Sequence, residues 1–268
     1  MKKSIFSIGL FLLLAVTACE LLEPSGKSIQ PLDSKIDFAV VESYPNYYKP
    51  SKPLIYLMMK TEKSYPCMNY YIATDFQRRG NEITVNVFGI GLDNVCATAF
   101  GPAGISIELG NLKGAYKLSF VNRTNNFEDS YNLIINDSLI IVDGKESENT
   151  KPLYDFYWRH PENSFACICN MQTPEASSLC EKFIDTLKSV INLKEFTFPA
   201  IGANPYFPLT ENTGNNVSAK YFYYDSETDF DKIGDVMKAF FQNNVPPDSG
   251  FEISVINWLN KKIESWLL

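Results

Sequence analysis

Hydrophobic and polar residues alternate in short runs between residues 36 and 143, and turn residues separate many of these runs. A two-residue period is typical of strands with one buried face, and no run here keeps the 3.6-residue period of a helix. Many short strands without an intervening helix predict a β-sandwich. The expected strands are 36–41, 54–59, 69–74, 83–88, 105–109, 115–121, 131–135 and 139–142.

The pattern changes after a polar run at 144–153, which we interpret as a linker between two domains. In the second domain, 154–268, Thr173 and Pro174 predict a helix start, and Thr228 with Asp231 predicts another. Strands are expected at 164–169, 195–198, 220–224 and 251–256, with a short closing helix at 259–267. The resulting β-α-β-β-α-β order predicts a ferredoxin-like α+β domain. The alternative is an irregular α+β cap packed on the sandwich.

The N-terminus has the pattern of an export signal. Three residues with two lysines precede an apolar run at 5–16, which is too short to cross a bilayer. The run ends in Val16-Thr17-Ala18-Cys19, which resembles the lipobox of bacterial lipoprotein precursors. The resemblance implies a signal peptide at 1–18, acylation of Cys19 and a lipid anchor in the cell envelope, with the outer membrane as the expected location. Residues 19–35 would form the tether. An ordinary signal peptide with an accidental cysteine is the alternative.

A second resemblance concerns residues 112–120, Leu-Lys-Gly-Ala-Tyr-Lys-Leu-Ser-Phe. This segment is similar to the tyrosine corner of immunoglobulin-like and fibronectin-type domains, in which a tyrosine hydroxyl bonds to nearby backbone. The resemblance gives Tyr116 that role and implies an Ig-like antiparallel sandwich at 36–143. No tryptophan lies between Cys67 and Cys96, so the antibody-type spacing is absent.

Charge and cysteine content fit an exported domain. Without Lys2 and Lys3 of the leader, 22 basic residues face 31 acidic ones, a net charge of −9 that disfavours nucleic-acid binding. Five cysteines follow Cys19, and an oxidising compartment favours disulfides among them. Cys67 and Cys96 are the expected pair in the first domain. In the second, Cys180 can pair with Cys167 or Cys169, and Cys169 is our candidate.

No residue set points to catalysis, a metal or a cofactor. His160 is the one histidine, and its Trp-Arg-His-Pro-Glu context predicts an exposed turn. We interpret Gly89-Ile90-Gly91 as a turn. The alternating acids Asp225, Glu227, Asp229 and Asp231 resemble a calcium loop, but acidic residues are also favoured at a helix start, which is our interpretation.

Aromatic residues in loops are weak candidates for binding: Tyr47 and Tyr48 in a Pro-rich segment, and Tyr206 and Phe207 in a long loop. The sequence therefore predicts an envelope lipoprotein that binds a protein or a glycan without catalysis. A carboxylate-dependent hydrolase and a structural adhesin or fimbrial subunit are the alternatives.

Overall fold

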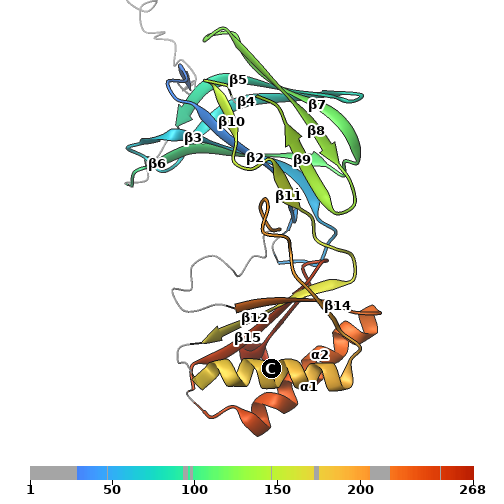
Figure 1. The fold of residues 1–268 in the computed structure, drawn as a ribbon. Helices are drawn as coiled ribbons and strands as arrows, with labels where there is room; N and C mark the ends of the chain where they lie inside the picture. The colour runs from blue at the N-terminus through green and yellow to red at the C-terminus, as the bar shows by residue number, and fades with distance from the viewer. Residues whose placement is uncertain are drawn as a thin grey trace, which may run out of the picture.

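Two β-sheets and two helices form the body of the protein (Figure 1). The computed structural model describes residues 29–268 except 47, 93–95, 97–98, 146, 172–174, 206–217 and 248. The expectations for the signal peptide, Cys19, Tyr47, Tyr206 and Phe207 therefore lie outside the described residues. An 11-stranded sheet, here the large sheet, precedes a five-stranded sheet, here the small sheet.

The large sheet contains all eight strands predicted for the first domain, most of them longer than predicted. Its order is β10-β2-β3-β6-β4-β5-β7-β8-β9-β11, and β1 pairs with β5. The strands are β1 (Ile29–Gln30), β2 (Ile36–Ser43), β3 (Leu54–Tyr65), β4 (Tyr70–Arg79), β5 (Glu82–Leu92), β6 (Gly101–Gly110), β7 (Gly114–Asn122), β8 (Phe127–Ile135), β9 (Leu139–Asp143), β10 (Thr150–Pro152) and β11 (Phe156–Trp158).

Strand direction in the large sheet differs from the prediction. The pairs β4·β6, β5·β7 and β10·β2 are parallel, so the sheet is mixed, and the expected purely antiparallel arrangement is wrong. Alternation of apolar residues shows which face of a strand is buried, but it carries no information on the direction of the neighbouring strand. The sheet curls so that its two halves face each other around one core (Figure 1).

Aromatic packing and hydroxyl bonds fix the edge of this core. Phe38 of β2 lies 4.7 Å from Phe120 and 4.9 Å from Tyr131, measured between ring centroids. The Tyr131 hydroxyl bonds to Thr150 of β10, and the Thr150 hydroxyl donates to Asp129 at 2.7 Å. The polar run at 144–153 thus includes a strand of the large sheet, because buried hydroxyl partners compensate for its lack of apolar residues.

Gly89 and Gly91 lie inside β5, so the predicted turn at this position is wrong. Gly89 has φ +147°, and a Cβ placed there would lie 2.0 Å from the carbonyl oxygen of Gln30. Glycine is therefore required for β1 to approach β5 closely enough to pair with it.

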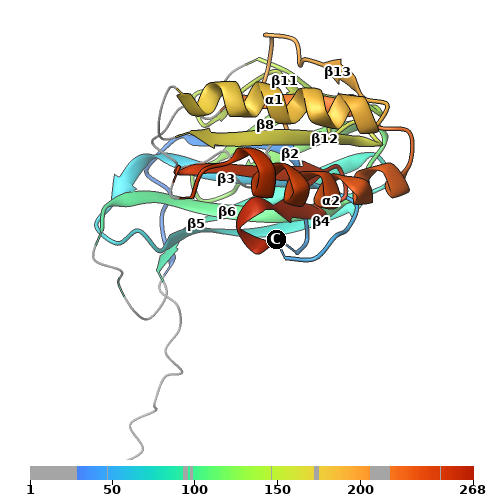
Figure 2. The ribbon, with the colours of Figure 1, turned by 90° about the horizontal axis from the view of Figure 1, so that it is seen from below.

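The small sheet is antiparallel, with order β13-β14-β12-β15-β16. The two helices cover the face turned away from the large sheet (Figures 1 and 2). The core between helices and sheet is rich in phenylalanine, with Phe165, Phe183, Phe222 and Phe230 fully buried. The elements are β12 (Ser164–Met171), α1 (Glu175–Val190), β13 (Lys194–Phe196), β14 (Ser218–Tyr223), α2 (Glu227–Asn244), β15 (Phe251–Asn257) and β16 (Lys262–Glu264).

Two predicted boundaries of this domain are wrong. Ser226, rather than Thr228, caps α2, and its side chain accepts a hydrogen bond from the Asp229 backbone. The expected closing helix is replaced by β16 and a single 3₁₀ turn, Ser265–Leu267, because the 251–264 segment forms a hairpin. No helix in the described part of the chain is long and apolar enough to cross a membrane.

Candidate functional site

A cleft with a volume of about 690 Å³ opens where the large sheet meets the small one. It is bordered by the ends of β2 and β3, the turns before β7 and β9, the 159–162 segment, β14 and the turn after β15. Three cations and three carboxylates lie along it, so its charges balance. The cleft residues are Glu42, Lys52, Pro53, Leu54, Asn111, Leu112, Lys113, Asp137, Ser138, Arg159, His160, Pro161, Glu162, Tyr223 and Trp258.

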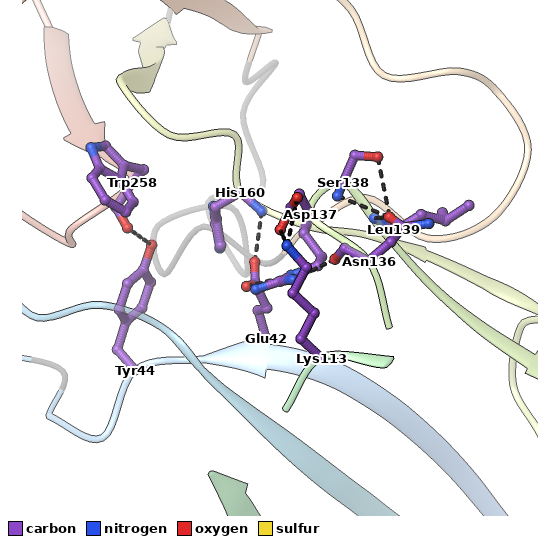
Figure 3. Close-up of polar contacts among 10 residues, drawn as sticks. Glu42, Tyr44, Lys113, Asn136, Asp137, Ser138, Leu139, His160 and Trp258 are labelled. Atoms are coloured by element: carbon purple, nitrogen blue, oxygen red, sulfur yellow. Dashed lines mark hydrogen bonds and ion pairs between the residues drawn. The ribbon is translucent and has the colours of Figure 1, made fainter. Parts of the chain in front are cut away.

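Glu42, near the end of β2, holds the chain segment that leads into the small sheet. One carboxylate oxygen accepts from Arg159 Nε at 2.8 Å, and the other accepts from the His160 backbone N–H at 2.7 Å (Figure 3). Arg159 also donates to the Asn136 carbonyl in the turn before β9. The Glu42 side chain is 1% exposed, so this ion pair lies in the floor of the cleft.

Burial is the largest influence on the pKa of the Glu42 carboxyl. Desolvation raises the pKa of Glu42 above its ordinary value of 4.5, while the charge of Arg159 and the His160 N–H counteract part of that rise. Both carboxylate oxygens are already occupied by donors. This geometry gives Glu42 a structural role in fixing the two sheets relative to each other.

The rim of the cleft carries an exposed ion pair. Lys113 Nζ donates to Asp137 at 2.6 Å, which lowers the pKa of the Asp137 carboxyl. The turn that carries Lys113 is held by Tyr116, whose hydroxyl donates to the Lys113 carbonyl at 3.2 Å. This is the bond to nearby backbone that the sequence predicts for Tyr116, and it fixes the turn that carries Lys113.

Aromatic side chains line the small-sheet side. Tyr223 is 36% exposed and stacks on Phe196 of β13 with ring centroids 4.4 Å apart. Trp258 is only partly exposed, and Lys52 Nζ lies over its ring at 5.4 Å. The Trp258 backbone carbonyl accepts from the Tyr44 hydroxyl at 2.9 Å (Figure 3). Tyr223 is therefore the exposed aromatic platform of the cleft.

His160 is buried, not exposed in a turn as its sequence context predicts. Its side chain packs against Tyr44, with ring centroids 5.4 Å apart, and the residue is 4% exposed. The local sequence gives the turn but cannot reveal that β2 and the small sheet close over it.

The disulfides are Cys67–Cys96 and Cys169–Cys180. Of the two alternatives for Cys180, the structure therefore forms the bridge to Cys169. Cys167 lies two residues earlier on the same face of β12, buried under the helices, and burial raises the pKa of its thiol to about 12. A thiolate is the reactive form of cysteine, so burial makes Cys167 inert.

We expect Cys167 to resist iodoacetamide in the folded protein at mildly alkaline pH. Unfolding in guanidinium without reductant should make the Cys167 thiol react, as located by digestion and mass spectrometry of the alkylated protein. Rapid alkylation of the folded protein would contradict this assignment.

The remaining candidates within the described part of the chain do not meet in the cleft. Tyr48 is 90% exposed on the β2–β3 connection and does not line it. The alternating acids near α2 have separate partners: Asp225 accepts from Asn192, Glu227 from Tyr224, and Asp229 from Lys232. This arrangement fits a helix start.

Sequence reasoning missed Glu42 and Arg159. The sequence gives one indication of Glu42, which directly follows the apolar strand pattern of 36–41. In the structure its side chain is as buried as those of its apolar neighbours. A charged residue in such a place needs a partner, but 117 positions separate it from Arg159. Comparison with known proteins adds nothing, since no family model, curated protein or solved structure matches the chain.

Proposed function

We propose that this protein is an envelope lipoprotein, anchored through Cys19, whose cleft binds a neutral carbohydrate without cleaving it. The lipobox at residues 16–19 supports the anchor, and the two disulfides are typical of an oxidising compartment outside the cytoplasm. The balanced, aromatic-lined cleft is the observation that carries the choice of ligand.

Three features of the cleft support a carbohydrate. Its volume lies within the range of small-molecule sites, about 300 to 1,000 Å³. The exposed ring of Tyr223 offers an apolar face of the kind that stacks on a sugar ring, and Phe196 fixes its orientation. The Lys113–Asp137 pair on the rim of the same cleft supplies both donors and acceptors for hydroxyl groups without net charge.

We also propose a fold class for each of the two sheets. We assign the small sheet to the ferredoxin-like class, on the support of its β-α-β-β-α-β order and the central position of β14 and β12. We assign the large sheet to the Ig-like sandwiches on the weaker support of the Tyr116 bond. Its parallel pairs are the departure from that class.

A hydrolase is the alternative function, and one observation favours it. The pKa of Glu42 is raised and that of Asp137 is lowered within one cleft, as in an acid and base pair. However, the Glu42 side chain is 1% exposed and both its oxygens accept hydrogen bonds, so it cannot reach a glycosidic oxygen. Binding is therefore the preferred function.

The test is calorimetric titration of the protein with two neutral oligosaccharides, chitohexaose and maltohexaose, alongside a reducing-end assay. We expect binding without release of new reducing ends. Tyr223→Ala should weaken binding roughly ten-fold, as expected for the loss of an aromatic contact worth about 1.4 kcal/mol.

Tyr154→Ala is the matched control, because Tyr154 is a 53%-exposed tyrosine that does not line the cleft. Equal affinity of the two variants, or no binding of either sugar, would refute the carbohydrate site. New reducing ends that disappear in Glu42→Gln would instead establish the hydrolase.

A further inference from the structure

We infer that the end of the large sheet near Ile29 rests on the lipid surface to which the protein is anchored. The inference concerns a surface far from the cleft and rests on the lipid anchor at Cys19 proposed above. It follows from where the chain enters the sheet and from which side chains surround that point.

The direction of β1 defines the entry point. β1 runs antiparallel to β5, with Ile29 opposite Gly91, so its N-terminal end points toward Leu92, the end of β5. Ten peptide steps separate Cys19 from Ile29, which limits their separation to about 33 to 36 Å even in a fully extended chain. An acylated Cys19 therefore confines this end of the sheet near the bilayer.

Strand pairing brings three exposed apolar side chains to the same end. Leu92 pairs with Tyr70, which follows Met68 by two residues. Gly101 pairs with Tyr65 at the end of β3, and a Cβ at Gly101 would lie 3.2 Å from Met68 Cβ, so Phe100 and Met68 are neighbours.

We call Ile29, Met68 and Phe100 the entry patch. Their exposed fractions are 47%, 59% and 80%, respectively. The Cys67–Cys96 disulfide fixes the segment that carries Met68. Large apolar side chains exposed together on a rigid support, next to an acyl anchor, fit shallow insertion at the headgroup boundary.

The experiment uses the full chain expressed with its own leader, purified from bacterial membranes and reconstituted into vesicles of phosphatidylethanolamine and phosphatidylglycerol. A phospholipid with a photoactivatable diazirine in its acyl chain labels side chains in contact with lipid. Intact mass first establishes whether Cys19 is acylated. Reduction, digestion and mass spectrometry then locate the label.

We expect label on the peptides that contain Met68 and Phe100, and its loss from the segments around both positions in the double variant Met68→Ser, Phe100→Ser. The internal controls are Met58 and Ile134, which are 47% and 42% exposed but lie away from the entry patch. Ile134→Ser should leave the labelling unchanged. Both substituted positions are exposed, so the thermal midpoint should not shift.

Two results would overturn the inference and identify its cause. An acylated protein labelled equally at Met58 and Ile134, or unlabelled at Phe100, would remove the entry patch while leaving the anchor intact. A mature chain without acyl mass on Cys19 would remove the anchor itself. Neither result bears on carbohydrate binding in the cleft.

Discussion

Glu42→Ala is expected to lower the free energy of unfolding by about 3 to 5 kcal/mol, the usual cost of removing one partner from a buried ion pair. The variant leaves the Arg159 guanidinium without its carboxylate and the His160 N–H without its acceptor, both in the floor of the cleft. Chemical denaturation followed by tryptophan fluorescence measures the change, since Trp158 directly precedes Arg159 and Trp258 lines the same cleft.

The matched control for this variant is Glu195→Ala. Glu195 pairs with Lys188 at 2.9 Å, but both side chains are about 40% exposed, so its loss should cost about 1 kcal/mol or less. Equal losses of unfolding free energy in the two variants would show that the buried Glu42 pair contributes no more to stability than an exposed pair.

The pH dependence of the Glu42 contribution follows from its raised pKa. The folded state favours the protonated carboxyl, so a pH-dependent part of the stability, separate from the cost of leaving Arg159 unpaired, is present below the ordinary value of 4.5 and is lost as pH rises through the folded pKa. The stability of the wild type relative to Glu42→Gln should therefore fall as pH rises through this window. A difference that grows with pH would contradict the assigned direction.

Phe38→Ala is the second substitution with a large expected effect, about 3 to 5 kcal/mol of unfolding free energy. Phe38 is fully buried between Phe120 and Tyr131, and Tyr131 in turn bonds Thr150 of the edge strand β10. The cavity left by the ring removes contacts on both sides and loosens the support of β10.

Ile134→Ala provides the comparison for Phe38→Ala. Ile134 lies in β8, the strand that also carries Tyr131, but its side chain is 42% exposed. Its truncation should therefore change the unfolding free energy by about 0.5 kcal/mol or less. Thermal unfolding monitored by circular dichroism distinguishes the two. A Phe38→Ala midpoint equal to that of the wild type would mean that the core repacks around the missing ring.

Local patterns predicted the elements of this chain well, and long-range contacts poorly. The alternation of apolar and polar residues predicted the strands from β2 to β9, because the residues of each strand themselves show which of its faces is buried. The buried His160 depends on Tyr44 and Glu42, which are more than 100 positions away, so no local pattern could reveal it. The Tyr116 bond was predictable because its acceptor is three residues distant.

The length of β3 determines how far the cleft lies from the entry patch. β3 runs for 12 residues from Leu54 at the cleft to Tyr65 beside the entry patch, a span of about 36 Å at 3.3 Å per residue. The surface potential of anionic lipid decays over a Debye length of about 8 Å at physiological ionic strength. With the Tyr65 end on the bilayer, as inferred above, the cleft lies more than about four such lengths away, so its affinity for the proposed carbohydrate should be independent of the lipid headgroup charge.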